Sequence, residues 1–254
     1  MNPKYTRYSQ LAKLLAILLC ALALKSFYST ASVNELRWIL TPTTLLVELV
    51  SGRTFNFEMH AGYMSNDNSF LIASSCVGVN FMIAAFLMLS IAKLWQGRLA
   101  WKFIPAAFVI SYATTIVANT VRISTALHLQ NSRLDIAGLS ANQLHRLEGI
   151  VIYFGFLLLL FLLSERTEVQ TPFANSDSHA VRFDHFMLPL LVYYVTTLGM
   201  PLMNAIYRQE FSASAFFEHS SFVLLAPLLL IAPFLIIRSN QRTVGSEQQT
   251  ASRQ

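Results

Sequence analysis

Long runs of apolar residues constrain the fold of this chain more than any motif does. Such runs are typical of membrane-spanning helices, which need roughly 20 consecutive apolar residues, and they are continuous rather than alternating. Six runs can be marked: Leu11–Tyr28, Cys76–Leu94, Phe103–Leu127, Glu148–Leu163, Phe186–Ile206 and Phe222–Ile237. We therefore predict an all-α, polytopic membrane helical bundle of about six spans, with residues 1–240 as one domain and 241–254 as a polar cytoplasmic tail.

Composition agrees with a membrane protein and argues against other classes. The chain of 254 residues is 54% hydrophobic and 12% charged, and a soluble domain carries about twice that charged fraction. A net charge of +5 does not indicate nucleic-acid binding, because the lysines and arginines gather at the ends of the apolar runs, as membrane topology requires. Two cysteines are too few for a disulfide framework. No metal or other cofactor is expected.

The segment between the first two runs is expected to stay at one membrane surface. Residues 36–50 are apolar but short, and they include Arg37, Pro42 and Glu48. These interruptions favour an interfacial or re-entrant helix over one that crosses the bilayer. Residues 53–68 are polar and rich in turn formers, so we expect a loop there.

The positive charges predict which side of the membrane each loop occupies. With a cytoplasmic N-terminus and residues 36–50 not crossing, eleven lysines and arginines lie on the cytoplasmic side and seven on the outer side. This bias follows the positive-inside rule, and it would reverse beyond residues 36–50 if they crossed. The first run is interpreted as a spanning helix; a cleaved signal peptide, suggested by Ala21-Leu22-Ala23, is the alternative.

Three residues of catalytic type lie at the outer ends of these runs, although they are far apart in the sequence. Cys76 begins the second run, Arg122 lies near the end of the third, and His145 just precedes the fourth. A thiol at a helix start is activated by the helix dipole, and Ser74 or Ser75 is the expected cap of that helix. An arginine beside the thiol can stabilise an oxyanion, and a histidine can act as base or acid. Cysteine acyl transfer requires these groups.

Each of these residues also has a structural explanation. A single cysteine in an apolar protein is usually a small buried hydrophobic residue, and Arg122 can extend outward as an interface anchor. An arginine inside a span is costly, however, and is therefore a functional candidate. Asn119, on the same helical face, is expected to orient it. His128 is a competing base, and Cys20, in the middle of the first run, is interpreted as structural.

Together these stretches resemble the exosortase/archaeosortase family of polytopic membrane cysteine transpeptidases. The residues that carry the resemblance are Cys76-Val77-Gly78, Asn119-Thr120-Val121-Arg122-Ile123, and His145 with Gly149 and Tyr153 behind it. The resemblance extends from about residue 36 to 163, and Val77 departs from it, since many members have a small hydroxyl residue there. It implies that Cys76 is the nucleophile and that Arg122 and His145 complete the catalytic set. The supporting or substrate-binding candidates are Asn119, Gly78, Ser75 and Asn80.

The resemblance implies a processing enzyme of the bacterial cytoplasmic membrane with its active site on the outer face. Its substrates would be membrane-anchored proteins with a C-terminal sorting signal, which it would cleave and transfer to an acceptor. Three other classes stay open from the residues alone. They are a multi-span transporter or channel with Arg122 and Asn119 along a polar path, a membrane thiol oxidoreductase that uses Cys20 and Cys76, and a non-catalytic assembly subunit. The oligomeric state does not follow from the sequence.

Overall fold

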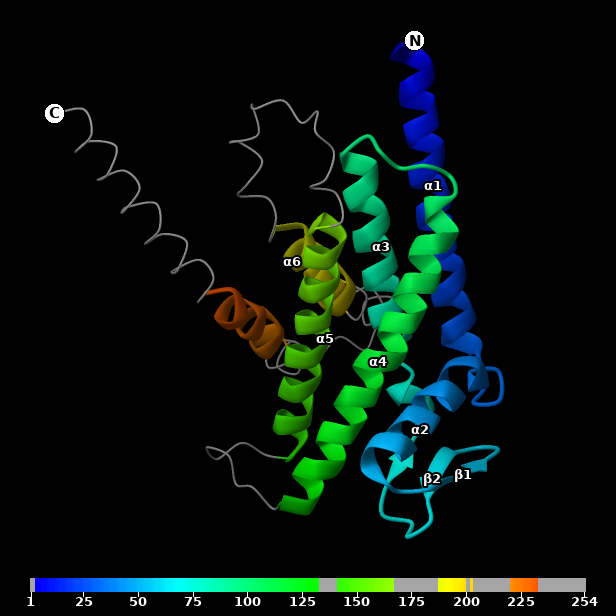
Figure 1. The fold of residues 1–254 in the computed structure, drawn as a ribbon, viewed down its shortest axis with the longest axis vertical. Helices are drawn as coiled ribbons and strands as arrows, with labels where there is room; N and C mark the ends of the chain where they lie inside the picture. The colour runs from blue at the N-terminus through cyan, green and yellow to red at the C-terminus, as the bar shows by residue number, and fades with distance from the viewer. Residues whose placement is uncertain (1–2, 133–140, 167–186, 200–201, 203–219, 233–254) are drawn as a thin grey trace, which may run out of the picture.

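Four long helices form the body of the molecule, in a computed structural model that describes residues 3–132, 141–166, 187–199, 202 and 220–232. They are α1 (Pro3–Thr30), α3 (Val79–Trp95), α4 (Phe103–Ser132) and α5 (Ala141–Arg166). Each forms all or most of a stretch long and apolar enough to cross a membrane. These stretches are Tyr8–Thr30, Ser74–Trp95, which also includes the residues just before α3, Phe103–Gln130 and Gln143–Glu165. The four helices run alternately in opposite directions (Figure 1). The prediction of a helical membrane bundle is confirmed to this extent.

The fifth and sixth predicted spans are not confirmed. In the described residues they correspond to two shorter apolar helices, Met187–Gly199 and Ser220–Ala232. The first of these consists of α6 (Met187–Tyr194) and a π-helical turn, η3 (Val195–Gly199). The other residues of both predicted spans, and the predicted tail 241–254, lie outside the described residues.

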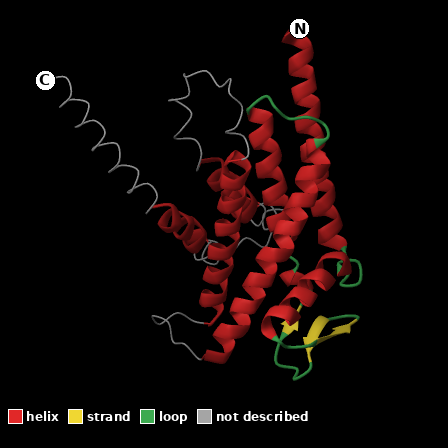
Figure 2. Ribbon diagram, viewed as in Figure 1, coloured by secondary structure: helices red, strands yellow, loops and turns green. Residues whose placement is uncertain are grey.

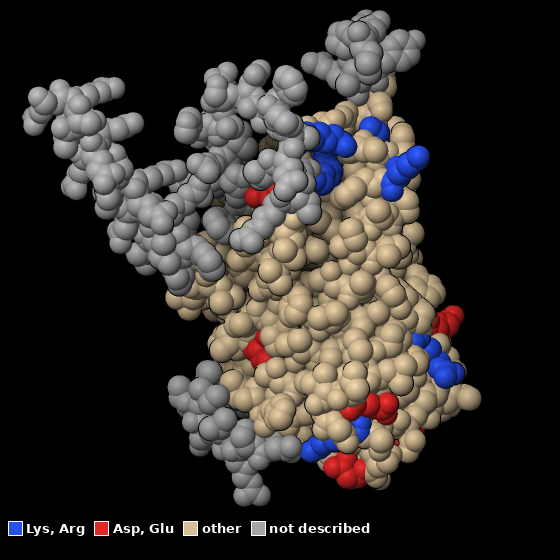
Figure 3. All heavy atoms as spheres, in the orientation of Figure 1, with Lys and Arg blue, Asp and Glu red and all other residues tan. Residues whose placement is uncertain are grey.

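Helix α3 is the centre of the bundle and packs against α1, α4, α5 and α6. Its spanning stretch is 67% buried, whereas that of α1 is 11% buried. The buried residues Ile17 and Ala21 mark the packed face of α1, while Leu11, Leu15 and Leu22 are exposed. Apolar side chains that face outward over a span are those that a bilayer would cover. Charged side chains gather at the two ends of the molecule and are sparse between them (Figure 3).

Helix α2 (Arg37–Ser51) lies at the end of the bundle where α1 finishes, and it packs against α4. It is not among the helices that could span a membrane, which agrees with the expected interfacial position. Pro42 lies inside the helix and has no N–H to donate to the carbonyl of Trp38, four residues earlier. The Tyr112 hydroxyl of α4 donates to that carbonyl instead, at 2.7 Å. A helix-breaking residue is thereby compensated by a tertiary contact.

The loop expected over residues 53–68 is wrong in part, because a small antiparallel sheet forms there and the fold is not strictly all-α. Its strands are β1 (Phe55–Glu58), β2 (Gly62–Ser65) and β3 (Leu71–Ile72), in the order β1-β2-β3. Figure 2 shows these strands confined to the α2 end of the molecule. Phe55, Tyr63 and Ile72 are buried in one cluster with α2 residues, so packing stabilises strands too short to be recognised from alternation alone.

Two polar contacts fasten the sheet to α2. The Tyr63 hydroxyl lies 2.7 Å from the Thr41 hydroxyl. The Glu48 carboxylate accepts a hydrogen bond from the Phe55 backbone N–H at 2.7 Å. Glu48, which interrupts the apolar stretch 36–50, therefore provides the hydrogen-bond acceptor for the first backbone N–H of β1. The sheet, α2 and the start of α3 form one packed cap.

Candidate active site

Cys76 lies in a short 3₁₀ turn, η1 (Ser74–Cys76), immediately before α3. The thiol is free and half-buried. Helix α3 begins at Val79 with Gly78 as its N-cap, and no side chain caps it. The expected cap by Ser74 or Ser75 is therefore wrong. Gly78 in the left-handed region occupies the cap position, and the two serines belong to the preceding turn.

Two buried contacts hold the Cys76 turn in place. The Asn119 side chain, which is fully buried on α4, donates from Nδ2 to the carbonyl of Val77 at 2.6 Å. On the other side, the Tyr28 hydroxyl of α1 donates to the carbonyl of Ser74 at 3.4 Å. Ser74 and Val77, which lie on either side of Cys76, are therefore hydrogen-bonded to two different helices, α1 and α4. These two contacts anchor the segment that carries the thiol.

Gly78 is required by both conformation and space. Its φ of +71° lies in the left-handed region, which is costly for residues with a Cβ. An added Cβ would lie 2.6 Å from Nδ2 and 2.7 Å from Oδ1 of Asn119. Only glycine allows the turn and the asparagine to approach this closely.

Tyr153 on α5 links Asn119 to Arg122. Its hydroxyl donates to Oδ1 of Asn119 and accepts from Nη1 of Arg122 at 3.0 Å. The Tyr153 ring stacks on Phe81 at a centroid distance of 5.0 Å, and the guanidinium lies 5.3 Å from the ring centroid. Asn119 thus orients Arg122 through Tyr153, where the sequence suggested a direct interaction.

His145 lies in the first turns of α5, beside the same arginine. Its side chain is 54% exposed, and Nδ1 lies 3.5 Å from Oε2 of Glu148. Helix α5 approaches α4 closely here, since a Cβ on Gly149 would lie 3.7 Å from Cδ of Arg122.

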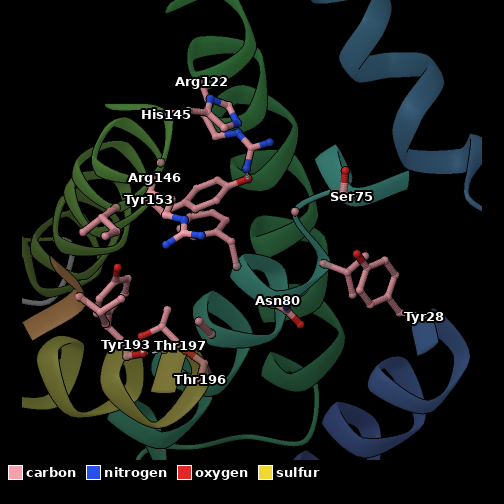
Figure 4. A pocket seen from close by; sticks show the side chains of 17 residues that line it. Tyr28, Ser75, Asn80, Arg122, His145, Arg146, Tyr153, Tyr193, Thr196 and Thr197 are labelled. Atoms are coloured by element: carbon pink, nitrogen blue, oxygen red, sulfur yellow. Dashed lines mark hydrogen bonds between the residues drawn. The ribbon is translucent and has the colours of Figure 1, made fainter. Parts of the chain in front are cut away.

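A cavity of about 360 Å³ collects most of the predicted site residues (Figure 4). Its lining includes Arg122, His145, Ser75, Gly78, Asn80, Tyr28, Arg146 and Tyr153. Tyr193, Thr196 and Thr197, from α6 and η3, form the opposite wall. Cys76 follows Ser75 at the margin, without lining the cavity itself. The Tyr28 hydroxyl contacts the Ser74 carbonyl and the Tyr153 hydroxyl contacts Arg122, and both tyrosines line the same cavity.

The remaining candidates lie apart from this cavity or play other roles. Asn80 accepts a hydrogen bond from Nζ of Lys25 at 3.0 Å, which joins α3 to α1 at the margin of the cavity. His128 is exposed on α4 and does not line the cavity. Cys20 is exposed on α1. In the part of the chain that the structure describes, no three His, Cys, Asp or Glu side chains group as a metal site would require.

Tyr28 and Glu148 are two residues of this region that the sequence analysis missed, as it did Arg146, Tyr193, Thr196 and Thr197. A tyrosine at the end of an apolar run is usually read as an interface anchor, and nothing local indicates that Tyr28 reaches the Cys76 turn. Glu148 was treated only as the first residue of a span, although its spacing of three residues from His145 was a usable signal.

The same chain was compared with known proteins. No protein-family model matches it, and neither the curated proteins nor the solved structures contain a match. The geometry around Cys76, Arg122 and His145 is therefore the basis on which its function has to be argued.

Proposed function

We propose that the protein is a membrane-embedded cysteine peptidase or transpeptidase, similar to the exosortases, that cleaves the C-terminal sorting signals of membrane-anchored proteins. One observation carries the proposal: Arg122 and His145, from different helices, line one cavity at whose margin Cys76 is held. A thiol, a guanidinium and an imidazole are the groups that cysteine acyl transfer uses. Two supporting candidates, Asn119 and Gly78, fix the turn that carries the thiol.

The guanidinium of Arg122 is suited to bind a developing oxyanion. Its Nη1 is engaged by Tyr153, which fixes the plane of the group. Its Nε is buried without a hydrogen-bond partner in the described residues. The guanidinium itself belongs to a residue that lines the cavity, so its positive charge would stabilise a tetrahedral oxyanion there more strongly than the neutral carbonyl that precedes it.

The reaction follows from a thiol that an imidazole can deprotonate. His145 takes the proton of the Cys76 thiol as the sulfur attacks the scissile carbonyl carbon and forms a C–S bond, and Arg122 stabilises the negative oxygen. The C–N bond then breaks, and His145 transfers its proton to the leaving amine. An acceptor amine or water attacks the thioester, its proton passes to His145, and the C–S bond breaks. The sulfur takes the proton back from His145, which restores the starting state.

The position of the cavity fits a substrate that is anchored in the same membrane. The cavity lies where α3 begins, towards the α2 and sheet end of the bundle, whereas α1 begins at the opposite end. A cytoplasmic N-terminus would therefore put it near the outer face, as the distribution of positive charges favours. A substrate that diffuses in two dimensions would present a peptide bond next to its own helix at this depth.

Processing of a sorting-signal protein in cells tests this proposal. Precursor should accumulate uncut with Cys76→Ala, Arg122→Ala or His145→Ala, while each variant still inserts into the membrane. Cys20→Ala is the matched control and should process normally. Normal processing by Cys76→Ala would reject the nucleophile assignment. Equal damage from Cys20→Ala and Cys76→Ala would instead favour a thiol oxidoreductase.

The outer location has a separate test. In a Cys20→Ser background Cys76 is the single thiol of the chain, and a membrane-impermeant maleimide added to intact cells should label it. Labelling only after the membrane is opened would contradict the outer orientation and leave the catalytic assignment to the processing test.

A further inference from the structure

Glu148 is an acidic residue in an unfavourable position that the proposed reaction does not yet use. It lies on α5 at the start of a run that continues into Gly149, Ile150 and Val151. Its side chain is 5% exposed, and neither carboxylate oxygen has a hydrogen-bond partner in the described residues. Burial of a carboxylate under these conditions is strongly destabilising unless a cation compensates it.

His145 is the group that can compensate it. Its Nδ1 lies 3.5 Å from Oε2 of Glu148, one helical turn earlier on the same face. An interaction at Nδ1 leaves Nε2 as the ring nitrogen available to a substrate in the cavity. The carboxylate is therefore placed to determine how the imidazole is presented.

The charges around the cavity explain why an anion is needed there. Arg122 on α4 and Arg146 on α5 both line it with His145, and two cations disfavour a third. The other titratable side chains that line the cavity are Tyr28, Tyr153 and Tyr193, and Cys76 lies at its margin, next to Ser75. Glu148 is the carboxylate that contacts the imidazole. A carboxylate at this distance offsets the repulsion from the guanidinium groups when the ring takes up a proton during the reaction.

We propose that Glu148 is a positioning residue that orients His145 through Nδ1 and stabilises the imidazolium that forms during the reaction. This catalytic purpose rests on the proposed function, whereas the contact between the two side chains is a feature of the structure itself. The Ser-His-Asp triad uses a carboxylate in the same way.

The contact can be tested without any enzymatic activity. Diethylpyrocarbonate modifies neutral imidazole, so its rate at His145 at pH 6, followed by mass spectrometry on the full-length protein in nanodiscs, reports the fraction of unprotonated ring. Glu148→Gln should raise this rate by about threefold or more, because the imidazolium loses its anionic partner. Glu165→Gln, the same change at the other end of α5, should leave it unchanged. An unchanged rate in Glu148→Gln would overturn the proposal.

A double-mutant cycle tests the catalytic purpose, with the slow residual processing by His145→Ala followed over long incubations. Glu148→Gln should lower the processing rate by about 10-fold or more, and should add nothing in a His145→Ala background, because a residue that acts through another is silent without it. Additive losses would indicate a merely structural role and overturn the proposal. If Glu148→Gln does not fold, Glu148→Asp replaces it in both assays. Its shorter side chain should give intermediate rates, and wild-type rates in both would also overturn the proposal.

These readouts separate the two proposals. A faster reaction at His145 in Glu148→Gln, combined with no processing by the wild type, would support the Glu148 contact and reject the peptidase. Processing that depends on Cys76 but not on Glu148 would keep the peptidase and reject the positioning role.

Discussion

The two ends of α3 have similar backbones, but they differ in what surrounds them. Each has a glycine in the left-handed region, Gly78 with φ of +71° and Gly97 with φ of +69°. A Cβ added at Gly78 would collide with the Asn119 amide, whereas one at Gly97 would meet nothing within 4 Å. The same local conformation therefore serves tertiary packing at one end and only a turn at the other.

The polar contacts differ in the same way. At the Gly78 end, buried side chains from α4 and α5 form a chain of hydrogen bonds through Asn119, Tyr153 and Arg122. At the Gly97 end, the turn is closed mainly by its own backbone, for example by the Gly97 N–H to the Leu94 carbonyl at 3.0 Å. Buried polar networks are costly when incomplete. Their concentration at one end of α3 is what distinguishes the candidate site from the turn at the opposite end.

The largest effect that follows from this comparison is that of an alanine at the two glycines. Gly78→Ala combines left-handed strain with a collision, so we expect a loss of about 3 kcal/mol or more in the free energy of unfolding, together with loss of processing. Gly97→Ala carries the strain alone and should cost about 1 kcal/mol. Thermal unfolding in detergent measures both. Equal effects would show that the two turns do not differ as described.

The four long helices could be predicted well from the sequence, because hydropathy decides them, whereas the fifth and sixth predicted spans are not confirmed. The expected spans Leu11–Tyr28 and Phe103–Leu127 fall within the spanning stretches Tyr8–Thr30 and Phe103–Gln130. The sheet could not be predicted, since four-residue strands such as Phe55–Glu58 depend on packing against α2. The prediction that a serine caps α3 was wrong because the N-cap residue is Gly78, not a hydroxyl residue.

The candidate site could be predicted in its residue types but not in its connections. Arg122 and His145 were selected for their place at the ends of spans, and the structure brings both to one cavity. The hydrogen bonds within the site depend on side chains from several helices. Tyr153 bridges Asn119 and Arg122, and Tyr28 reaches across from α1. No spacing along the chain reveals such contacts, because they depend on how the helices pack.

A second test of the difference between the two ends of α3 removes one oxygen atom from the hydrogen bonds that join Asn119, Tyr153 and Arg122. Tyr153→Phe deletes the hydroxyl that joins Asn119 to Arg122 but keeps the ring stacked on Phe81. Processing should fall by about 10- to 100-fold as the guanidinium loses its anchor, with a stability cost of about 1–2 kcal/mol. Tyr112→Phe is the matched control, since it loses one hydrogen bond to α2 away from the cavity. A similar loss of processing in both variants would assign the effect to stability.

A third, smaller effect is expected at the opposite end of α3. The main side-chain contact described there is from Nζ of Lys13 to the carbonyl of Leu99, at 2.6 Å. Lys13→Met keeps the aliphatic stem and removes the donor, so stability should fall by about 1 kcal/mol while processing per folded molecule is unchanged. A large loss of processing, measured against the amount of inserted protein, would mean that function is not confined to the Gly78 end.

The smallest effect concerns the sheet that covers the Gly78 end, and it depends on pH. Hydrogen bonds from the Ser65 and Ser69 hydroxyls and the Ser69 amide, with a weaker contribution from Arg53, lower the pKa of Asp67 from 3.8 to about 2. A group whose pKa is depressed by folding adds stability that is fully present above its unfolded pKa and is lost as pH falls through the folded pKa. Wild type should therefore exceed Asp67→Asn in melting temperature above about pH 4, and the difference should vanish towards pH 2. Because Asp67 is exposed, this difference should be small. A difference that stays constant between pH 4 and pH 2 would mean that the Asp67 charge does not stabilise the turn, and that the cap over the site depends on its apolar packing alone.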